Sequence, residues 1–203
     1  MNNLKNITVY CGSNFGEIPD YYEEAKRLGE LMAKEAIQLV YGGGKIGLMG
    51  ALANSVLQHN GTAIGIMPTF LKNKEMAHTG LTELIETPTM SIRKDKMMEM
   101  ADGFIAMAGG IGTYEELFEV FSALQLKQHT KPVGLLNVKG FFDPLLTMLE
   151  STAKQGFMPL ANMNLLCVAD NAGELIEKMR NFQFVDVPKW VTPKWVEEMR
   201  KGV

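Results

Sequence analysis

The stretch Met90–Glu119 constrains the fold more than any other part of the chain, because an apolar strand, a glycine-rich turn and a helix follow one another within it. Residues 104–108 (FIAMA) form a short apolar run, which is typical of a strand buried on both faces of a parallel sheet. The turn after it, residues 109–112 (GGIG), holds three glycines, and Thr113 is expected to cap the following helix. The stretch therefore predicts a strand, turn and helix unit whose turn lies at the carboxyl edge of a parallel sheet.

A glycine-rich turn at a helix N-terminus is a common phosphate-binding device, because free N–H groups and the positive end of the helix dipole point outward there. Gly109, Gly110 and Gly112 lack a Cβ, so a ligand can approach the backbone closely. Glu115 and Glu116 are expected in the first turn of the helix, where one carboxylate can face whatever the turn holds. A GGxGT run can also be a plain tight connection, and the surrounding residues decide between the two interpretations.

Strand-like and helix-like segments alternate along the rest of the chain with short connections. Further strands are expected at 6–11, 37–41, 61–68, 81–86, 133–136 and 164–168, and helices at 20–36, 48–60, 92–101, 141–155 and 171–180. This order predicts a single nucleotide-binding α/β domain over residues 1–203, a doubly wound, Rossmann-like parallel sheet with helices on both faces. Ser91 is expected to cap the helix that follows it. The tail, residues 181–203, carries both tryptophans and is expected to pack on the domain or on a partner.

Two other strand ends carry groups suited to the same edge of the sheet. The first strand ends in GSN, where Ser13 offers a hydroxyl, and the second is followed at once by a run of three glycines. Because the carboxyl ends of parallel strands meet at one edge, we expect Ser13, Gly43 and Gly44 to face a shared ligand cleft. A dinucleotide site is disfavoured, since no GxGxxG follows the first strand and no acidic residue ends the second. Mononucleotides are the ligand class that remains.

Positive charge gathers at the start of the helix before the central strand. Arg93 and Lys94 lie in its first turns, where like charge opposes the helix dipole; this gives a binding role some weight, and a solvated face is an equally open interpretation. Met90 flanks the same region; methionines among apolar neighbours more often fill a core, and Met90 is also a candidate lining residue. Glu75 lies in an irregular segment, residues 69–89, that resembles a lid or rim; taken alone it is a solvated surface charge.

Composition excludes several classes of protein. A net charge of -3 and a pI near 5.7 leave no basic excess for broad nucleic-acid binding. No apolar run reaches the roughly 18 residues of a membrane span, and the N-terminus leads straight into a strand, so a cytoplasmic protein without a membrane partner is expected. The histidines are scattered and neither Cys11 nor Cys167 belongs to a CxxC pair, so no metal is expected.

With these residues in hand, the chain resembles the "lonely guy" family of cytokinin riboside 5'-monophosphate phosphoribohydrolases, often mislabelled as lysine decarboxylases. The resemblance covers most of the chain and is carried by CGSN, YGGGKIGLMG, the Arg93-Lys94 pair, GGIGTYEE, and KPVGLLN followed by GFFDPLL. It implies that Arg93 and Glu116 are the catalytic pair. It also implies that the nucleotide is bound by Glu75, Arg93, Lys94, Gly110, Ile111, Gly112, Thr113, Tyr114, Glu115, Glu116 and Ser122.

The activity that the resemblance implies is hydrolysis of the N-glycosidic bond of an adenosine 5'-monophosphate, plain or N6-substituted, to free base and ribose 5-phosphate, without a cofactor. Such an AMP nucleosidase would serve cytokinin biosynthesis. A homodimer or higher homo-oligomer is also implied, although the apolar helix EELFEVFSALQL can equally be internal. Relatives usually carry proline where this chain has Ala108, and other residues in place of Ser91 and Ile92. These departures keep a second hypothesis open, a non-catalytic nucleotide carrier of the same fold. A pyridoxal-phosphate decarboxylase fits poorly, because no lysine stands out as a Schiff-base candidate.

Overall fold

The computed structural model describes residues 1–72, 76–187, 190 and 192–201. Its strands are β1 (Asn6–Tyr10), β2 (Gln38–Tyr41), β3 (Ala63–Pro68), β4 (Glu83–Thr87), β5 (Gly103–Ala106), β6 (Val133–Leu136) and β7 (Leu166–Ala169). Its α-helices are α1 (Pro19–Lys34), α2 (Gly47–Gln58), α3 (Met90–Met100), α4 (Ile111–Gln125), α5 (Asp143–Lys154), α6 (Ala172–Asn181) and α7 (Lys194–Lys201). Short 3-10 helices span Thr69–Leu71, Val138–Gly140 and Leu160–Leu165.

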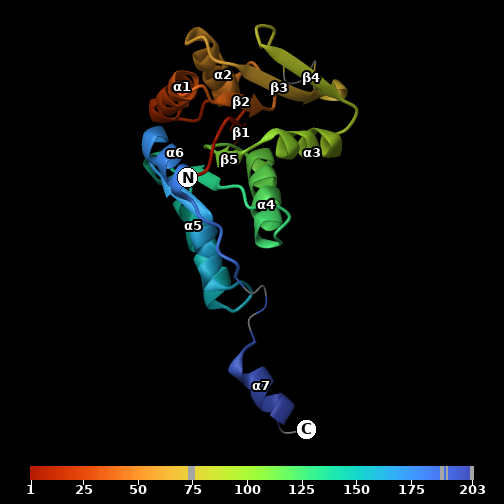
Figure 1. Cartoon of the computed structure of the whole chain (residues 1–203), viewed down its shortest axis with the longest axis vertical. Coiled ribbons are helices and arrows are strands. Elements are labelled where there is room, and N and C mark those ends of the chain that lie inside the picture. Colours follow the sequence, from red (N-terminus) through yellow and green to blue (C-terminus); the bar gives the residue numbers. More distant parts are fainter. Residues whose placement is uncertain (73–75, 188–189, 191, 202–203) are drawn as a thin grey trace.

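The strands form one parallel sheet in the order β4-β3-β2-β1-β5-β6-β7 (Figure 1). The chain adds strands outward from β1 to β4, crosses back through α3, and then adds β5 to β7 on the other side of β1. The connections therefore diverge between β1 and β5, which is the topological switch point where ligands bind in open α/β sheets. The predicted doubly wound, Rossmann-like architecture is confirmed.

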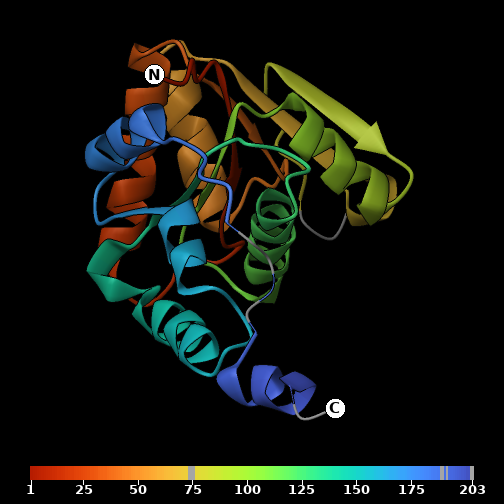
Figure 2. The ribbon, with the colours of Figure 1, turned by 60° about the horizontal axis from the view of Figure 1, so that its bottom comes forward.

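The two faces of the sheet are covered by different helices (Figures 1 and 2). One core lies under α1, α2 and α6 and includes Leu28, Leu52 and Leu175. The other lies under α3, α4 and α5 and includes Met97 and Leu117. Side chains of β1 alternate between these cores, because successive residues of a strand point to opposite faces. Helices α3 and α4, which carry Arg93 and Glu116, therefore cover the same face of the sheet.

Two predicted helix caps are wrong. The cap of α3 is Thr89, whose hydroxyl accepts a hydrogen bond from the Ile92 N–H at 3.2 Å, and Ser91 lies exposed within the first turn. Since β4 ends at Thr87, the chain enters the helix earlier than the charge pattern suggested. The cap of α4 is the backbone of Gly110, and no side chain caps it.

The start of α4 also changes the expected position of its acidic residues. Because the helix begins at Ile111, Thr113 is a buried helical residue, and Glu115 and Glu116 lie in the second turn, not the first. Another boundary differs near the C-terminus, where residues 160–165 form a 3-10 helix and β7 begins at Leu166. Glycine and apolar runs locate these elements, but backbone geometry sets where each begins.

The tail, residues 181–203, has a first part that contacts the domain and a second part that contains α7. Its beginning is held by Asn2, whose side-chain amide donates to the carbonyls of Met179 and Phe182, and by an ion pair of 2.6 Å between Lys127 and Asp186. Helix α7 lies apart from the sheet in Figure 1, and its Trp195 is exposed. Packing of this end on a partner stays a prediction. No described helix combines the length and apolar character that a membrane crossing needs.

Candidate active site

A pocket of about 280 Å³ lies at the switch point, where β1, β2 and β5 end and α3 and α4 begin. Of the residues predicted from the sequence, those that line it are Ser13, Met90, Arg93, Gly110, Ile111, Gly112, Thr113, Glu115 and Glu116. They come from three separate segments of the chain, which the sheet topology brings to one edge. The structure thus places the glycine turn, the candidate guanidinium and the candidate carboxylate around one hollow.

Arg93 and Glu116 face each other across the pocket. Nη2 of Arg93 on α3 lies 3.7 Å from Oε1 of Glu116 on α4, and the side chains are only 7% and 12% exposed. Arg93 Nη1 lies 3.7 Å from the Met90 sulfur, a weak acceptor. Arg93 Nε has no hydrogen-bond partner in the part of the chain that the structure describes. A buried guanidinium with unused donors is costly, and a ligand that brings oxygen acceptors removes this cost.

Gly42, at the end of β2, makes room for this guanidinium. A Cβ at residue 42 would overlap Nη2 of Arg93 and lie 3.2 Å from the sulfur of Met49. The position of Arg93 therefore depends on a glycine that is distant in the sequence and adjacent in space.

The glycines of the turn have different tasks. A Cβ at Gly109 would overlap the Thr113 hydroxyl and lie 2.9 Å from the N atom of Gly12, so this glycine lets the β1 and β5 loops pack together. Gly110 and Gly112 meet nothing within 4 Å, and neither has a positive φ. Nothing in the described protein requires glycine there, and glycine costs a helix up to about 1 kcal/mol relative to alanine. Space kept open at a helix N-terminus is suited to an anion.

We expect Gly112→Ala to leave the free energy of unfolding unchanged or raise it by up to about 1 kcal/mol, while weakening AMP binding at least about tenfold. The added methyl group enters space that is empty in the protein and that we expect the ligand to occupy. Gly173→Ala is the matched control, because Gly173 is likewise the second residue of a helix and its nearest neighbour is an ordinary 3.6 Å contact. Urea denaturation and calorimetric titration with AMP measure both effects. Unchanged AMP affinity in Gly112→Ala contradicts the prediction.

Lys94 ties α3 to α4 beside the pocket. Its ammonium pairs with Glu115 and, at 3.2 Å, with Glu119, and the side chain is 18% exposed. The hydrogen bond to Glu115 raises the pKa of Lys94 above its usual value, so the ammonium stays charged. Lys94 and Glu115 are therefore engaged with each other, and a direct contact with the nucleotide stays a prediction for both.

Several predicted residues lie away from the hollow. Gly43 has a φ of +80° and packs on Gly65 and Leu84, and the Gly44 carbonyl accepts a hydrogen bond of 3.1 Å from the Tyr41 hydroxyl. These two glycines shape the turn after β2, whereas Gly42 reaches the pocket.

On α4, the Tyr114 ring stacks on Phe141 with centroids 6.3 Å apart, and Ser122 is exposed further along the helix. Neither is among the lining residues of the pocket. Glu75 lies outside the described residues.

Sequence reasoning missed Tyr10, Gly42, Met49 and Leu71, which also line the pocket. Gly42 belongs to the run of three glycines from which the sequence analysis selected Gly43 and Gly44. Tyr10 could have been found from the alternation of side chains along the first strand. Cys11 lines the wall as well, and burial raises the pKa of its thiol, which disfavours the nucleophilic thiolate form.

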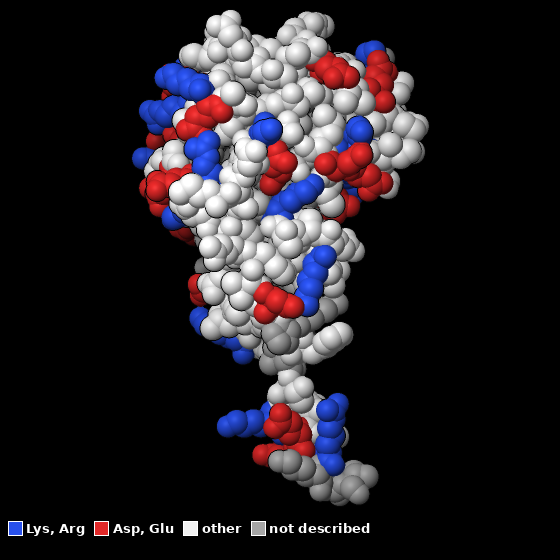
Figure 3. Space-filling view, in the orientation of Figure 1, with Lys and Arg blue, Asp and Glu red and all other residues white. Residues whose placement is uncertain are grey.

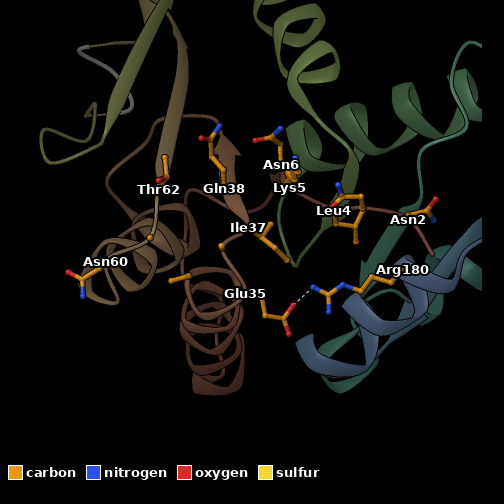
Figure 4. Close-up of a pocket in the computed structure, with 14 residues that line it drawn as sticks. Asn2, Leu4, Lys5, Asn6, Glu35, Ile37, Gln38, Asn60, Thr62 and Arg180 are labelled. Carbon is orange, nitrogen blue, oxygen red and sulfur yellow. Dashed lines mark hydrogen bonds and ion pairs between the residues drawn. The ribbon is translucent and has the colours of Figure 1, made fainter.

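A larger cavity lies elsewhere. A hollow of about 630 Å³ at the amino edge of the sheet has five side-chain amides among its lining residues, and Figure 4 shows Glu35 and Arg180 pointing toward each other across it. The charges of Glu35 and Arg180 neutralise each other, and Lys5 is the other charged residue in the lining of this cavity.

Other site classes find little support in the described residues. No three His, Cys, Asp or Glu side chains among them come together as metal ligands. On the face drawn in Figure 3, basic and acidic side chains of described residues are interspersed, without one extended basic surface.

Comparisons with known proteins show the family of this chain. A cytokinin riboside 5'-monophosphate phosphoribohydrolase of Arabidopsis thaliana is 40% identical over 92% of this chain and 85% of its own length. One from Rhodococcoides fascians is 40% identical over 87% of this chain and 90% of its own.

Among solved structures, a molybdenum cofactor binding protein from Rippkaea orientalis is 27% identical, with a TM-score of 0.65 over 88% of this chain and 97% of its own. The molybdenum cofactor carrier protein of Chlamydomonas reinhardtii, at 21% identity and a TM-score of 0.65 over 88% and 97% of the two chains, shows the shared fold. A family model described as "Possible lysine decarboxylase" matches residues 49–179. The chain therefore belongs to the family of the cytokinin riboside 5'-monophosphate phosphoribohydrolases.

Proposed function

We propose that this protein hydrolyses the N-glycosidic bond of an adenosine 5'-monophosphate, plain or N6-substituted, and releases the free base and ribose 5-phosphate. The observation that carries the proposal is the buried Arg93 and Glu116 pair, 3.7 Å apart, beside a helix N-terminus that no side chain caps. Relatives at 40% identity bear the name of this activity.

The 5'-phosphate binds at the start of α4. Backbone N–H groups of residues 110–113 and the helix dipole attract the anion, and Gly110 and Gly112 leave it room. Binding energy gained at this non-reacting group then positions the bond that breaks.

Glu116 acts at the ribose carbon. As the bond to the base breaks, positive charge develops on C1', and a nearby carboxylate stabilises that charge and orients the attacking water. One water molecule is consumed: the bond between C1' and the base nitrogen breaks, the water oxygen keeps one proton and bonds to C1' as a hydroxyl, and the other proton passes to the leaving base, which departs neutral. Arg93 holds the Glu116 carboxylate and offers its unused Nε and Nη donors to ribose or phosphate oxygens. Each step uses a group of this chain, and we propose that no metal or cofactor takes part.

The working assembly that we propose is a cytoplasmic homodimer with the pocket near the interface. Ile111 and Ile92, at the starts of the two helices beside the pocket, are 87% and 46% exposed, and a second copy would cover them. Light scattering on the purified protein decides between this dimer and a monomer.

The decisive experiment incubates the protein with AMP, N6-isopentenyl-AMP and, as a phosphate-free control, adenosine, and quantifies free base by chromatography. We expect base from at least one monophosphate and little from adenosine, because the phosphate anchors the substrate. No base from either monophosphate contradicts the hydrolase.

The alternative is a carrier that binds a phosphorylated ligand without cleaving it. Its support is the likeness to the molybdenum cofactor binding protein and the residue Ala108 at the turn. It predicts that nucleotide raises the melting temperature without turnover. The retained Arg93 and Glu116 pair favours the enzyme.

A further inference from the structure

Tyr10 lies on the floor of the candidate active site, at the carboxyl end of β1. Its side chain is 4% exposed and lines the same pocket as Arg93 and Glu116. The ring stacks on that of Phe104 on the neighbouring strand β5, with ring centroids 6.3 Å apart and an angle of 5° between the ring planes. This packing fixes the ring, so the hydroxyl occupies one place in the pocket.

The hydroxyl of Tyr10 is without a hydrogen-bond partner among the residues that the structure describes. Other buried hydroxyls of these strands are satisfied: Thr8 donates to the Met97 carbonyl at 2.9 Å, and Tyr41 donates to the Gly44 carbonyl at 3.1 Å. Although the residue as a whole is 4% exposed, its hydroxyl is not among the fully buried polar atoms that lack a partner, so this oxygen is accessible from the pocket. An accessible hydroxyl in the pocket lining that makes no hydrogen bond to the described protein points to a ligand atom as its partner.

The charges around Tyr10 indicate which part of the ligand lies there. Burial and the carboxylates of Glu116, Glu119 and Glu115 raise the pKa of the phenol well above its usual value, and Arg93 lowers it only in part. The hydroxyl is therefore neutral. A phosphate placed beside these carboxylates would be repelled, and the start of α4 is the better place for it. A neutral sugar hydroxyl, which both donates and accepts, suits the surroundings of Tyr10.

We propose that Tyr10 is a further substrate-binding residue of the hydrolase, whose hydroxyl hydrogen-bonds a ribose hydroxyl of the nucleotide. This inference rests on the proposed function. The contact fixes the sugar over Glu116 and makes the enzyme prefer ribonucleotides to deoxyribonucleotides, because a site built to hydrogen-bond a hydroxyl rejects the analogue that lacks it.

The test is Tyr10→Phe, which removes one oxygen and retains the ring that packs on Phe104. For AMP, kcat/KM is expected to fall at least about tenfold. With 2'-deoxy-AMP or 3'-deoxy-AMP, whichever lacks the contacted hydroxyl, wild type and Tyr10→Phe should become nearly equal. Tyr41→Phe is the control: its hydroxyl bonds the protein backbone, so the ratio of rates on AMP and deoxy-AMP should stay that of the wild type.

Two outcomes overturn the proposal: Tyr10→Phe loses the same factor on AMP and on both deoxynucleotides, or it loses nothing on AMP. Calorimetric titration of AMP and the two deoxynucleotides gives the same comparison from affinities. If the wild type releases no base from any nucleotide, the proposed hydrolase fails, and the binding comparison still decides the role of Tyr10.

Discussion

Glu116→Gln is expected to lower kcat for AMP hydrolysis by about 10²–10³-fold, a loss typical of removing one group that stabilises transition-state charge. Glutamine has nearly the same shape but no charge, so it cannot stabilise the positive charge that develops at C1'. Affinity for AMP should change much less, because the phosphate is bound by the start of α4 and not by this carboxylate. The change therefore falls on kcat and not on KM.

The matched control is Glu119→Gln on the same helix. Glu119 pairs with Lys94 at 3.2 Å and is not among the residues that line the pocket, so we expect its carboxylate not to contact the ribose. We expect the Glu119→Gln rate to stay within a few-fold of wild type, since exposed ion pairs contribute about 0–1 kcal/mol. Steady-state rates on AMP, with a thermal melt of each variant to verify folding, give the comparison. Equal rates for Glu116→Gln and the wild type would remove the carboxylate from the mechanism.

The sequence predicts the broad arrangement of this site because each part carries a local signal. Apolar runs such as residues 104–108 and 133–136 mark buried strands, and glycines directly after them mark the carboxyl edge of the sheet. Parallel topology then brings separate strand ends together, which is why Ser13 and the 109–112 turn were expected in one cleft and are found near one pocket.

The remaining details depend on geometry that has no local signal. Thr89 and Ser91 are both suitable cap residues, and the choice between them follows from where β4 ends. Likewise, a run of three glycines does not reveal that Gly42 faces the ligand site while Gly43 packs toward Leu84. That difference is decided by the path of the backbone and by an arginine from a distant helix.

Gly42→Ala is expected to abolish most of the activity, by about 10²-fold or more in kcat/KM, without unfolding the protein. The φ of Gly42 is not in the positive range, so alanine is compatible with the backbone. The new methyl would instead overlap Nη2 of Arg93 and crowd the sulfur of Met49. Both are ends of flexible side chains that can move aside at a cost of about 1 kcal/mol. When the guanidinium moves, Arg93 no longer holds Glu116 or the ligand.

The neighbouring substitution, Gly43→Ala, should behave in the opposite way. Here φ is +80° and the methyl would lie 3.1 Å from Leu84 Cδ1, so we expect a loss of about 1 kcal/mol or more in the free energy of unfolding. The rate per folded molecule should change far less, because residue 43 does not line the pocket. Urea denaturation and AMP hydrolysis measured on both variants separate the two effects. A stable and fully active Gly42→Ala protein would mean that the guanidinium of Arg93 need not lie over residue 42 for catalysis, and the proposed pairing with Glu116 would lose its main structural support.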